Sequence, residues 1–145
     1  MKYAALLLIA LSVVGCSDKK NYVRKGEIDK TLDQESIAKR YLEAIGIGAA
    51  DQNLTNSTQR RATSRNAAIV AAQYEMLSMI KGVEVEGGIR VEKAMETDSV
   101  LQTKIDAAIK GAEIIKSEWT NDDGCLVTLR LDKKRLQEQM GIKFK

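Results

Sequence analysis

The chain has 145 residues, with 23 Lys and Arg against 20 Asp and Glu, no His and no Pro. That length suits one domain. The mild net charge of +3, with both signs interspersed, argues against a nucleic-acid binder, which concentrates positive charge on one face. Without His there is no Ser-His or Cys-His nucleophile pair and no imidazole metal site, so we expect no enzymatic activity, no metal site and no cofactor.

The first residues predict an export signal. Lys2 precedes an apolar run over residues 4–14, roughly 17 Å long as a helix, whereas a bilayer core is about 30 Å thick. Val13-Val14-Gly15-Cys16 resembles the bacterial lipobox. This resemblance implies a signal peptide over residues 1–15, cleavage between Gly15 and Cys16, and lipid attachment at Cys16. A plain signal peptide with a coincidental Cys is the alternative.

The residue after Cys16 is Ser17, not Asp. By the sorting rule of Gram-negative lipoproteins, this favours the outer membrane over the inner one. Two or more acyl chains give stable anchoring, so we expect a permanent tether on the periplasmic face or the cell surface.

A linker is predicted over residues 16–36, because they are polar, charged and without apolar periodicity. Twenty flexible residues would separate domain and membrane by about 25 Å r.m.s.. The linker lysines could contact anionic headgroups, but acidic residues are mixed among them, and a solubilising spacer is the preferred interpretation. The folded domain then covers residues 37–145.

An alternating pattern over residues 41–49 predicts the first strand. Ile45, Ile47 and Ala49 share one face, and Gly46 and Gly48 share the other. Glycine within a strand suggests that another backbone approaches closely. A phosphate-binding loop is disfavoured, because no Lys-Ser or Lys-Thr pair follows the glycines.

A long helix is predicted over residues 57–80, with start signals at Asn56 and Ser57. Arg60, Arg61 and Arg65 crowd its first turns, where positive charge opposes the helix dipole unless it is compensated. They are candidates to meet an acidic partner surface or an anion, with a solvated face as the alternative. The apolar stripe predicted to face the core is Ala62, Ile69, Ala72, Met76 and Ile80.

Residues 83–92 alternate and predict a second strand, which Gly87 and Gly88 would bend or bulge. Its outward face carries Glu84, Glu86 and Glu92, which we interpret as a solvated sheet face rather than catalytic carboxylates. These acids and the arginines of the long helix could form complementary patches between neighbouring molecules. The inward face would carry Val83, Val85, Ile89 and Val91.

A second helix is predicted over residues 99–110, with cap candidates at residues 97–99 and Gly111 as its stop. Its apolar stripe is Leu101, Ile105, Ala108 and Ile109.

A hairpin follows this helix. A three-residue loop over 122–124, with Gly124 as its left-handed residue, would pair Trp119 with Val127 and Ile115 with Leu131. A short charged helix over 133–140 comes last.

Cys125 has no partner within the chain once Cys16 is acylated. Its place on the inward face of the last strand predicts burial, and an intermolecular disulfide is the alternative. A catalytic thiol would need a nearby base, and the chain has no His.

The fold class expected is α+β, with an antiparallel three- to four-stranded sheet packed on one long helix. Several segments over residues 41–131, together with the lipobox, resemble the LPP-twenty family of outer-membrane lipoproteins, which is related to flagellar basal-disk lipoproteins. The segments that carry this resemblance are EAIGIGA at 43–49, RRA at 60–62, RNAA at 65–68, IKGVEV at 80–85 and IKGAEII at 109–115, with Trp119 before a glycine-containing turn.

The resemblance implies a dodecin-like arrangement and a non-enzymatic, structural or assembly role in the cell envelope, including flagellar basal-disk or motor-associated rings. It implies partners that are copies of the chain or envelope and flagellar proteins. The alternatives are a monomeric module that binds a small ligand or a host partner and, with less support, an envelope hydrolase.

Overall fold

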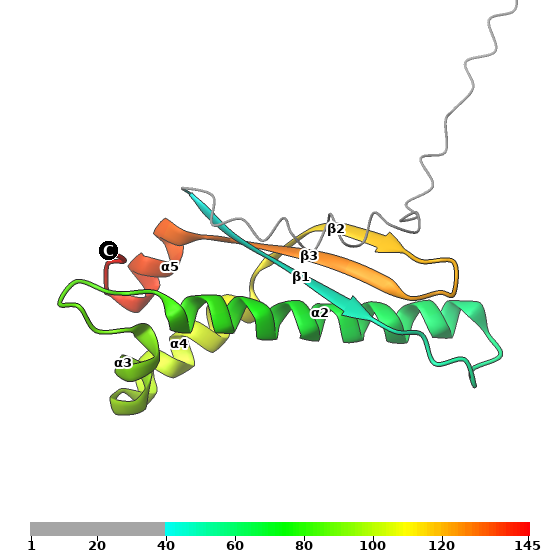
Figure 1. The fold of residues 1–145 in the computed structure, drawn as a ribbon, viewed down its shortest axis with the longest axis horizontal. Coiled ribbons are helices and arrows are strands. Elements are labelled where there is room, and N and C mark those ends of the chain that lie inside the picture. The colour runs from blue at the N-terminus through cyan, green and yellow to red at the C-terminus, as the bar shows by residue number, and fades with distance from the viewer. Residues whose placement is uncertain (1–39) are drawn as a thin grey trace, which may run out of the picture.

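A computed structural model describes residues 40–145, so the predicted signal peptide, Gly15, Cys16 and the linker lie outside the described residues. Three strands and four helices follow one another in this part of the chain (Figure 1). Their bounds are β1 (Tyr41–Gly48), α2 (Ser57–Gly82), α3 (Val91–Thr97), α4 (Ser99–Lys110), β2 (Glu113–Trp119), β3 (Cys125–Asp132) and α5 (Lys133–Met140).

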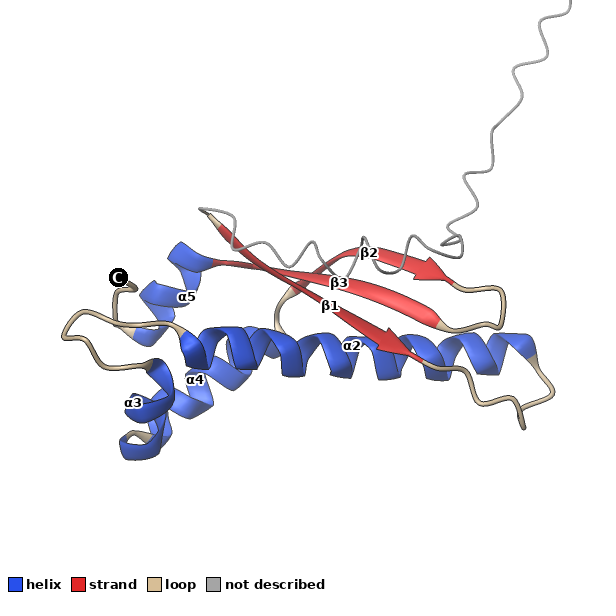
Figure 2. Ribbon diagram, in the orientation of Figure 1, coloured by secondary structure: helices blue, strands red, loops and turns tan. Residues whose placement is uncertain are grey.

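The three strands form an antiparallel sheet in the order β1-β3-β2, which confirms the α+β class. Tyr41 pairs with Asp132 and Gly48 with Cys125, so β1 and β3 are in register over their whole length. The sheet lies along α2 (Figure 2). The expectation of one long helix was too simple, because α3, α4 and α5 gather near the C-terminal end of α2.

The start of α2 is fixed by Asn56, whose side chain accepts a hydrogen bond of 2.8 Å from the backbone N–H of Thr58. Residues at every fourth position face the core. One member of the predicted stripe was wrong, because Ala62 is exposed, while Ile69 is half-buried and packs against the core. The buried positions are Ser64, Ala68, Ala72, Met76 and Ile80.

The glycines of β1 confirm the predicted close approach of another backbone. A Cβ atom at Gly46 would lie 2.1 Å from the carbonyl oxygen of Ala68, and one at Gly48 would lie 1.9 Å from that of Ser64. The glycine face of β1, not the isoleucine face, therefore packs on α2. Any side chain at either position would push the sheet away from the helix.

The strand predicted over residues 83–92 was wrong. Gly87 and Gly88 both have positive φ angles, and the chain reverses at them, so that the backbone N–H of Val85 donates to the carbonyl of Ile89 at 2.9 Å. Two isolated bridges remain, Glu84 with Arg90 and Val85 with Phe144, and Val91 already begins α3. Alternation placed the faces correctly for Val85 and Val91, which are buried, but not for Ile89, which is exposed.

The second predicted helix is confirmed as α4. Asp98 accepts hydrogen bonds from the backbone N–H groups of Val100 and Leu101, and Gly111 ends the helix. Its predicted apolar stripe is buried throughout. The last predicted helix has the observed bounds of α5, and Asp132 caps it in the same way.

The predicted hairpin register was wrong by two residues. Trp119 pairs with Cys125, and residues 120–124 form the connection. Asp123, not Gly124, takes the left-handed conformation, with φ of 64°. An irregularity between Ile114 and Lys116 then shifts the pairing, so Ile115 is 36% exposed instead of facing the core.

Candidate interaction surfaces

Arg60 and Arg61 converge on one carboxylate of the hairpin connection. Arg60 Nη2 lies 2.7 Å from Asp123 Oδ2, and Arg61 Nε lies 2.7 Å from Asp123 Oδ1. The Asp123 side chain is only 12% exposed. Hydrogen bonds from Arg61, and then from Arg60, hold the pKa of Asp123 below its usual range. The compensating anion at the start of α2 is therefore an internal one.

Neighbouring contacts tie the same connection to α2. The fully buried hydroxyl of Ser64 donates to the carbonyl oxygen of Asp123 at 2.7 Å. Arg60 Nη1 also donates to the carbonyl of Leu54 at 2.8 Å, and the guanidinium of Arg61 lies 5.6 Å from the centre of the Trp119 ring. Arg60, Arg61, Ser64 and Asp123, which we call the Asp123 cluster, lock the hairpin to the first turns of α2.

The remaining charged candidates lie apart from one another. Arg65 is half-buried and forms no ion pair with a described residue. Glu84, Glu86 and Glu92 are exposed just beyond the other end of α2, which at about 1.5 Å per residue is roughly 39 Å long. Within one chain, the predicted basic and acidic patches are therefore not brought together.

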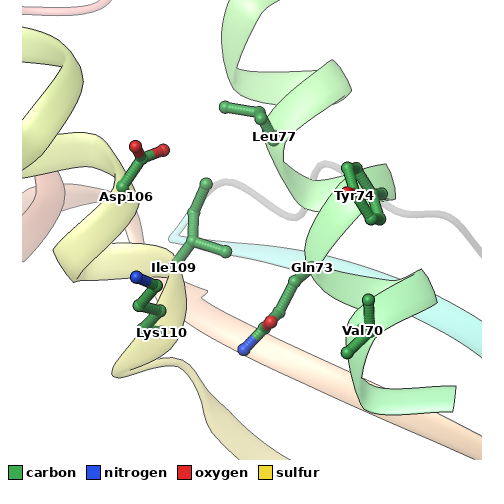
Figure 3. Close-up of a pocket in the computed structure, with 7 residues that line it drawn as sticks. All are labelled: Val70, Gln73, Tyr74, Leu77, Asp106, Ile109 and Lys110. Carbon is green, nitrogen blue, oxygen red and sulfur yellow. The ribbon is translucent and has the colours of Figure 1, made fainter. Parts of the chain in front are cut away.

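A groove between α2 and α4 was not anticipated from the sequence (Figure 3). It has a volume of about 250 Å³. Leu77 and Ile109 contribute apolar surface, and the polar groups of Gln73, Asp106 and Lys110 also line it. We call this the α2–α4 groove.

The outward face of α2 beside the groove lacks charge. Residues 66–74 include no Asp, Glu, Lys or Arg, although charged residues make up 30% of the chain. Within this segment Val70 is 50% exposed and Tyr74 is 69% exposed. Exposed aromatic and aliphatic groups without charge are typical of the centre of a protein interface. The sequence signal for this face is the gap in the charge pattern over residues 66–74.

Residues 40–145 contain no group of three or more Cys, Asp or Glu placed to hold a metal ion. Every buried polar side-chain atom among residues 40–145 has a hydrogen-bond partner, so none is left aimed at a ligand. Cys125 is buried as predicted, and its burial raises the pKa of the thiol. None of the helices in this part of the chain is long and apolar enough to span a membrane.

Comparison with known protein families and with curated proteins finds no match to this chain.

Proposed function

We propose that the protein is a lipoprotein of the outer membrane, anchored through Cys16, with a structural or assembly role in the cell envelope. The observation that carries the assembly role is the uncharged face of α2, where Val70 and Tyr74 are exposed and line the α2–α4 groove. The lipobox-like residues 13–16 support the anchor. The partners are copies of the chain or an envelope protein.

A more specific setting rests on the resemblance to LPP-twenty lipoproteins. A three-stranded antiparallel sheet along a long helix is compatible with a dodecin-like domain. In this setting the protein belongs to flagellar basal-disk or motor-associated rings.

The anchor is tested by comparing the wild-type protein with a Cys16→Ser variant expressed in a Gram-negative bacterium. We expect the wild type in the outer-membrane fraction, with the mass of a chain that starts at Cys16 and carries lipid. The variant should lose both the lipid and this fractionation. An unlipidated wild-type chain would contradict the anchor.

The assembly surface is tested with Val70→Glu in the lipidated protein, imaged by negative-stain electron microscopy. Burying an unpaired carboxylate at the centre of an interface weakens it by tenfold or more. Gln59→Glu, on the exposed first turn of the same helix, is the matched control. We expect symmetric oligomers in the wild type and control, and their loss in Val70→Glu. Identical particles in all three would contradict the assignment.

A small-ligand site is the second candidate, because the α2–α4 groove combines the apolar side chains of Leu77 and Ile109 with polar groups of Gln73, Asp106 and Lys110. It predicts a monomer that retains a small molecule after purification. Native mass spectrometry separates the two proposals, because the assembly role predicts multiples of the chain mass.

A further inference from the structure

A second groove, which we call the basic groove, lies where the described chain begins. It has a volume of about 530 Å³, and its floor includes the apolar side chains of Leu42 and Phe144. No acidic side chain lines it. Its four cationic lining residues are Arg40, Lys133, Lys134 and Lys145.

Acidic groups lie near three of these cations. Glu84 lies 3.9 Å from Lys145, and Glu138 lies 4.0 Å from Lys134, both at the limit of an ion pair. Asp132 lies 3.1 Å from Arg40, whose side chain is largely exposed. Exposed pairs of this kind contribute little, and Lys133 forms no ion pair with a described residue. The three lysines therefore remain available to an external anion.

The C-terminal segment, which supplies three of the four groove cations, is basic. Residues 130–145 contain six Lys or Arg and two Asp or Glu, whereas residues 40–129 contain ten and thirteen. The mild net charge of the whole chain therefore hides a basic C-terminal segment, which lies beside the exposed Glu84.

The position of the groove relates it to the anchor. Arg40, which lines the groove, lies only 24 positions after Cys16 in the chain. The backbone N–H of Lys133 donates to the carbonyl of Arg40 at 3.0 Å, which fixes the start of α5 beside the point where the chain joins the domain. A lipid at Cys16 would thus bring this end of the domain close to the headgroups.

We propose that the basic groove docks on anionic phospholipid headgroups of the membrane that holds the anchor. This rests on the proposed function, since it supplies a second membrane contact besides the acyl chains. Headgroup phosphates meet the cations that line the groove. Each Lys near an anionic surface strengthens binding roughly fivefold.

The test uses the unlipidated chain from Ser17 onward, which keeps the whole described core. Its co-sedimentation with vesicles of phosphatidylglycerol and phosphatidylcholine is compared with its co-sedimentation with vesicles of phosphatidylcholine alone. The test variant is Lys133→Glu with Lys134→Glu, two changes in the first turn of α5, where the helix dipole favours negative charge. The control is Lys93→Glu with Lys104→Glu, exposed lysines outside the groove that give the same change in net charge.

We expect the wild type and control to bind the anionic vesicles, with binding that weakens as salt rises. The groove variant should bind about tenfold more weakly or worse, and a Lys145→Glu variant should show a smaller loss. Equal losses in the groove variant and the control would overturn the proposal, as would equal binding to both vesicle types. Displacement by free glycerol phosphate at low concentration would assign the groove to a soluble anion and also overturn it. Lipid at Cys16 is scored separately by mass, so failure of the anchor is distinguishable.

Discussion

The two ends of α2 both gather arginines and lysines, but they use them in opposite ways. At the start of the helix, Arg60 and Arg61 are held by one nearly buried carboxylate, Asp123. Beyond the other end, Lys133 and Lys134 line an open groove whose acidic neighbours lie at the surface. A basic cluster in a sequence therefore indicates a partner surface only where no buried internal anion already satisfies it.

The largest expected difference in stability between the two ends of α2 comes from substitutions at two glycines. Gly48→Ala should destabilise the fold by about 3 kcal/mol or more, because its Cβ would lie 1.9 Å from a backbone oxygen of α2. Gly82→Ala, at the far end of the same helix, has nothing within 4 Å of the added Cβ. Urea unfolding should show the second variant at least as stable as the wild type. Equal losses of stability in both variants would contradict the tight packing of Gly48 against the first half of α2.

The next effect is the pH dependence of stability that Asp123 contributes at the start of α2. The pKa of Asp123 is lowered in the folded chain, so the unfolded state takes up its proton first as the pH falls. The stability that this carboxylate contributes is complete above its unfolded pKa of about 3.9, and it is lost as the pH falls through the lower folded value.

Asp123→Asn should therefore be less stable than the wild type at neutral pH. The difference in the free energy of unfolding between the two proteins should narrow below about pH 4. Denaturant unfolding over a pH series measures it, and subtraction of the two curves removes the contribution of Asp132, whose pKa is also lowered and which Asp123 does not affect. A difference in stability that stays constant at all pH values would exclude the ion pairs of Asp123 with Arg60 and Arg61 as its cause.

A smaller effect is expected from the buried hydroxyl in the Asp123 cluster. Ser64→Ala removes the donor to the carbonyl of Asp123 and leaves that buried acceptor without it, at a cost of about 1 kcal/mol. Thr63→Ala is the matched control, because its exposed hydroxyl bonds only to carbonyls of its own helix. Thermal unfolding should rank Ser64→Ala below Thr63→Ala, and the reverse order would contradict the buried bond.

The smallest effect on stability is expected in the basic groove, beyond the C-terminal end of α2. Lys134→Glu should change the free energy of unfolding by no more than about 0.5 kcal/mol, because the residue is exposed and pairs weakly. A loss of several times that size would show that the basic groove is a structural element like the Asp123 cluster.

Local patterns predicted much of this fold. The long helix, α4 and α5 follow from apolar spacing and from polar caps such as Asn56 and Asp98, and the glycine face of β1 followed from Gly46 and Gly48. The strand predicted over residues 83–92 was wrong, because an alternating pattern assigns faces but does not show that the chain reverses at the positive φ angles of Gly87 and Gly88. These features depend on a few residues that are close in sequence.

The surfaces were harder to predict than the elements. The pairing of Arg60 with Asp123 joins residues 63 positions apart. It depends on a left-handed conformation at Asp123, whereas the sequence pattern predicted that conformation at Gly124. The basic groove likewise combines Arg40 with residues more than 90 positions later. Such sites arise from strand pairing, which local spacing does not determine.

The central claim is that the domain assembles through the uncharged face of α2. Light scattering coupled to size exclusion gives the mass of the unlipidated chain from Ser17 directly, and the same run on Val70→Glu tests the face. We predict a mass of several chains for the wild type and one chain for the variant. A wild-type mass of a single chain, in this form and in the lipidated protein, would contradict the claim.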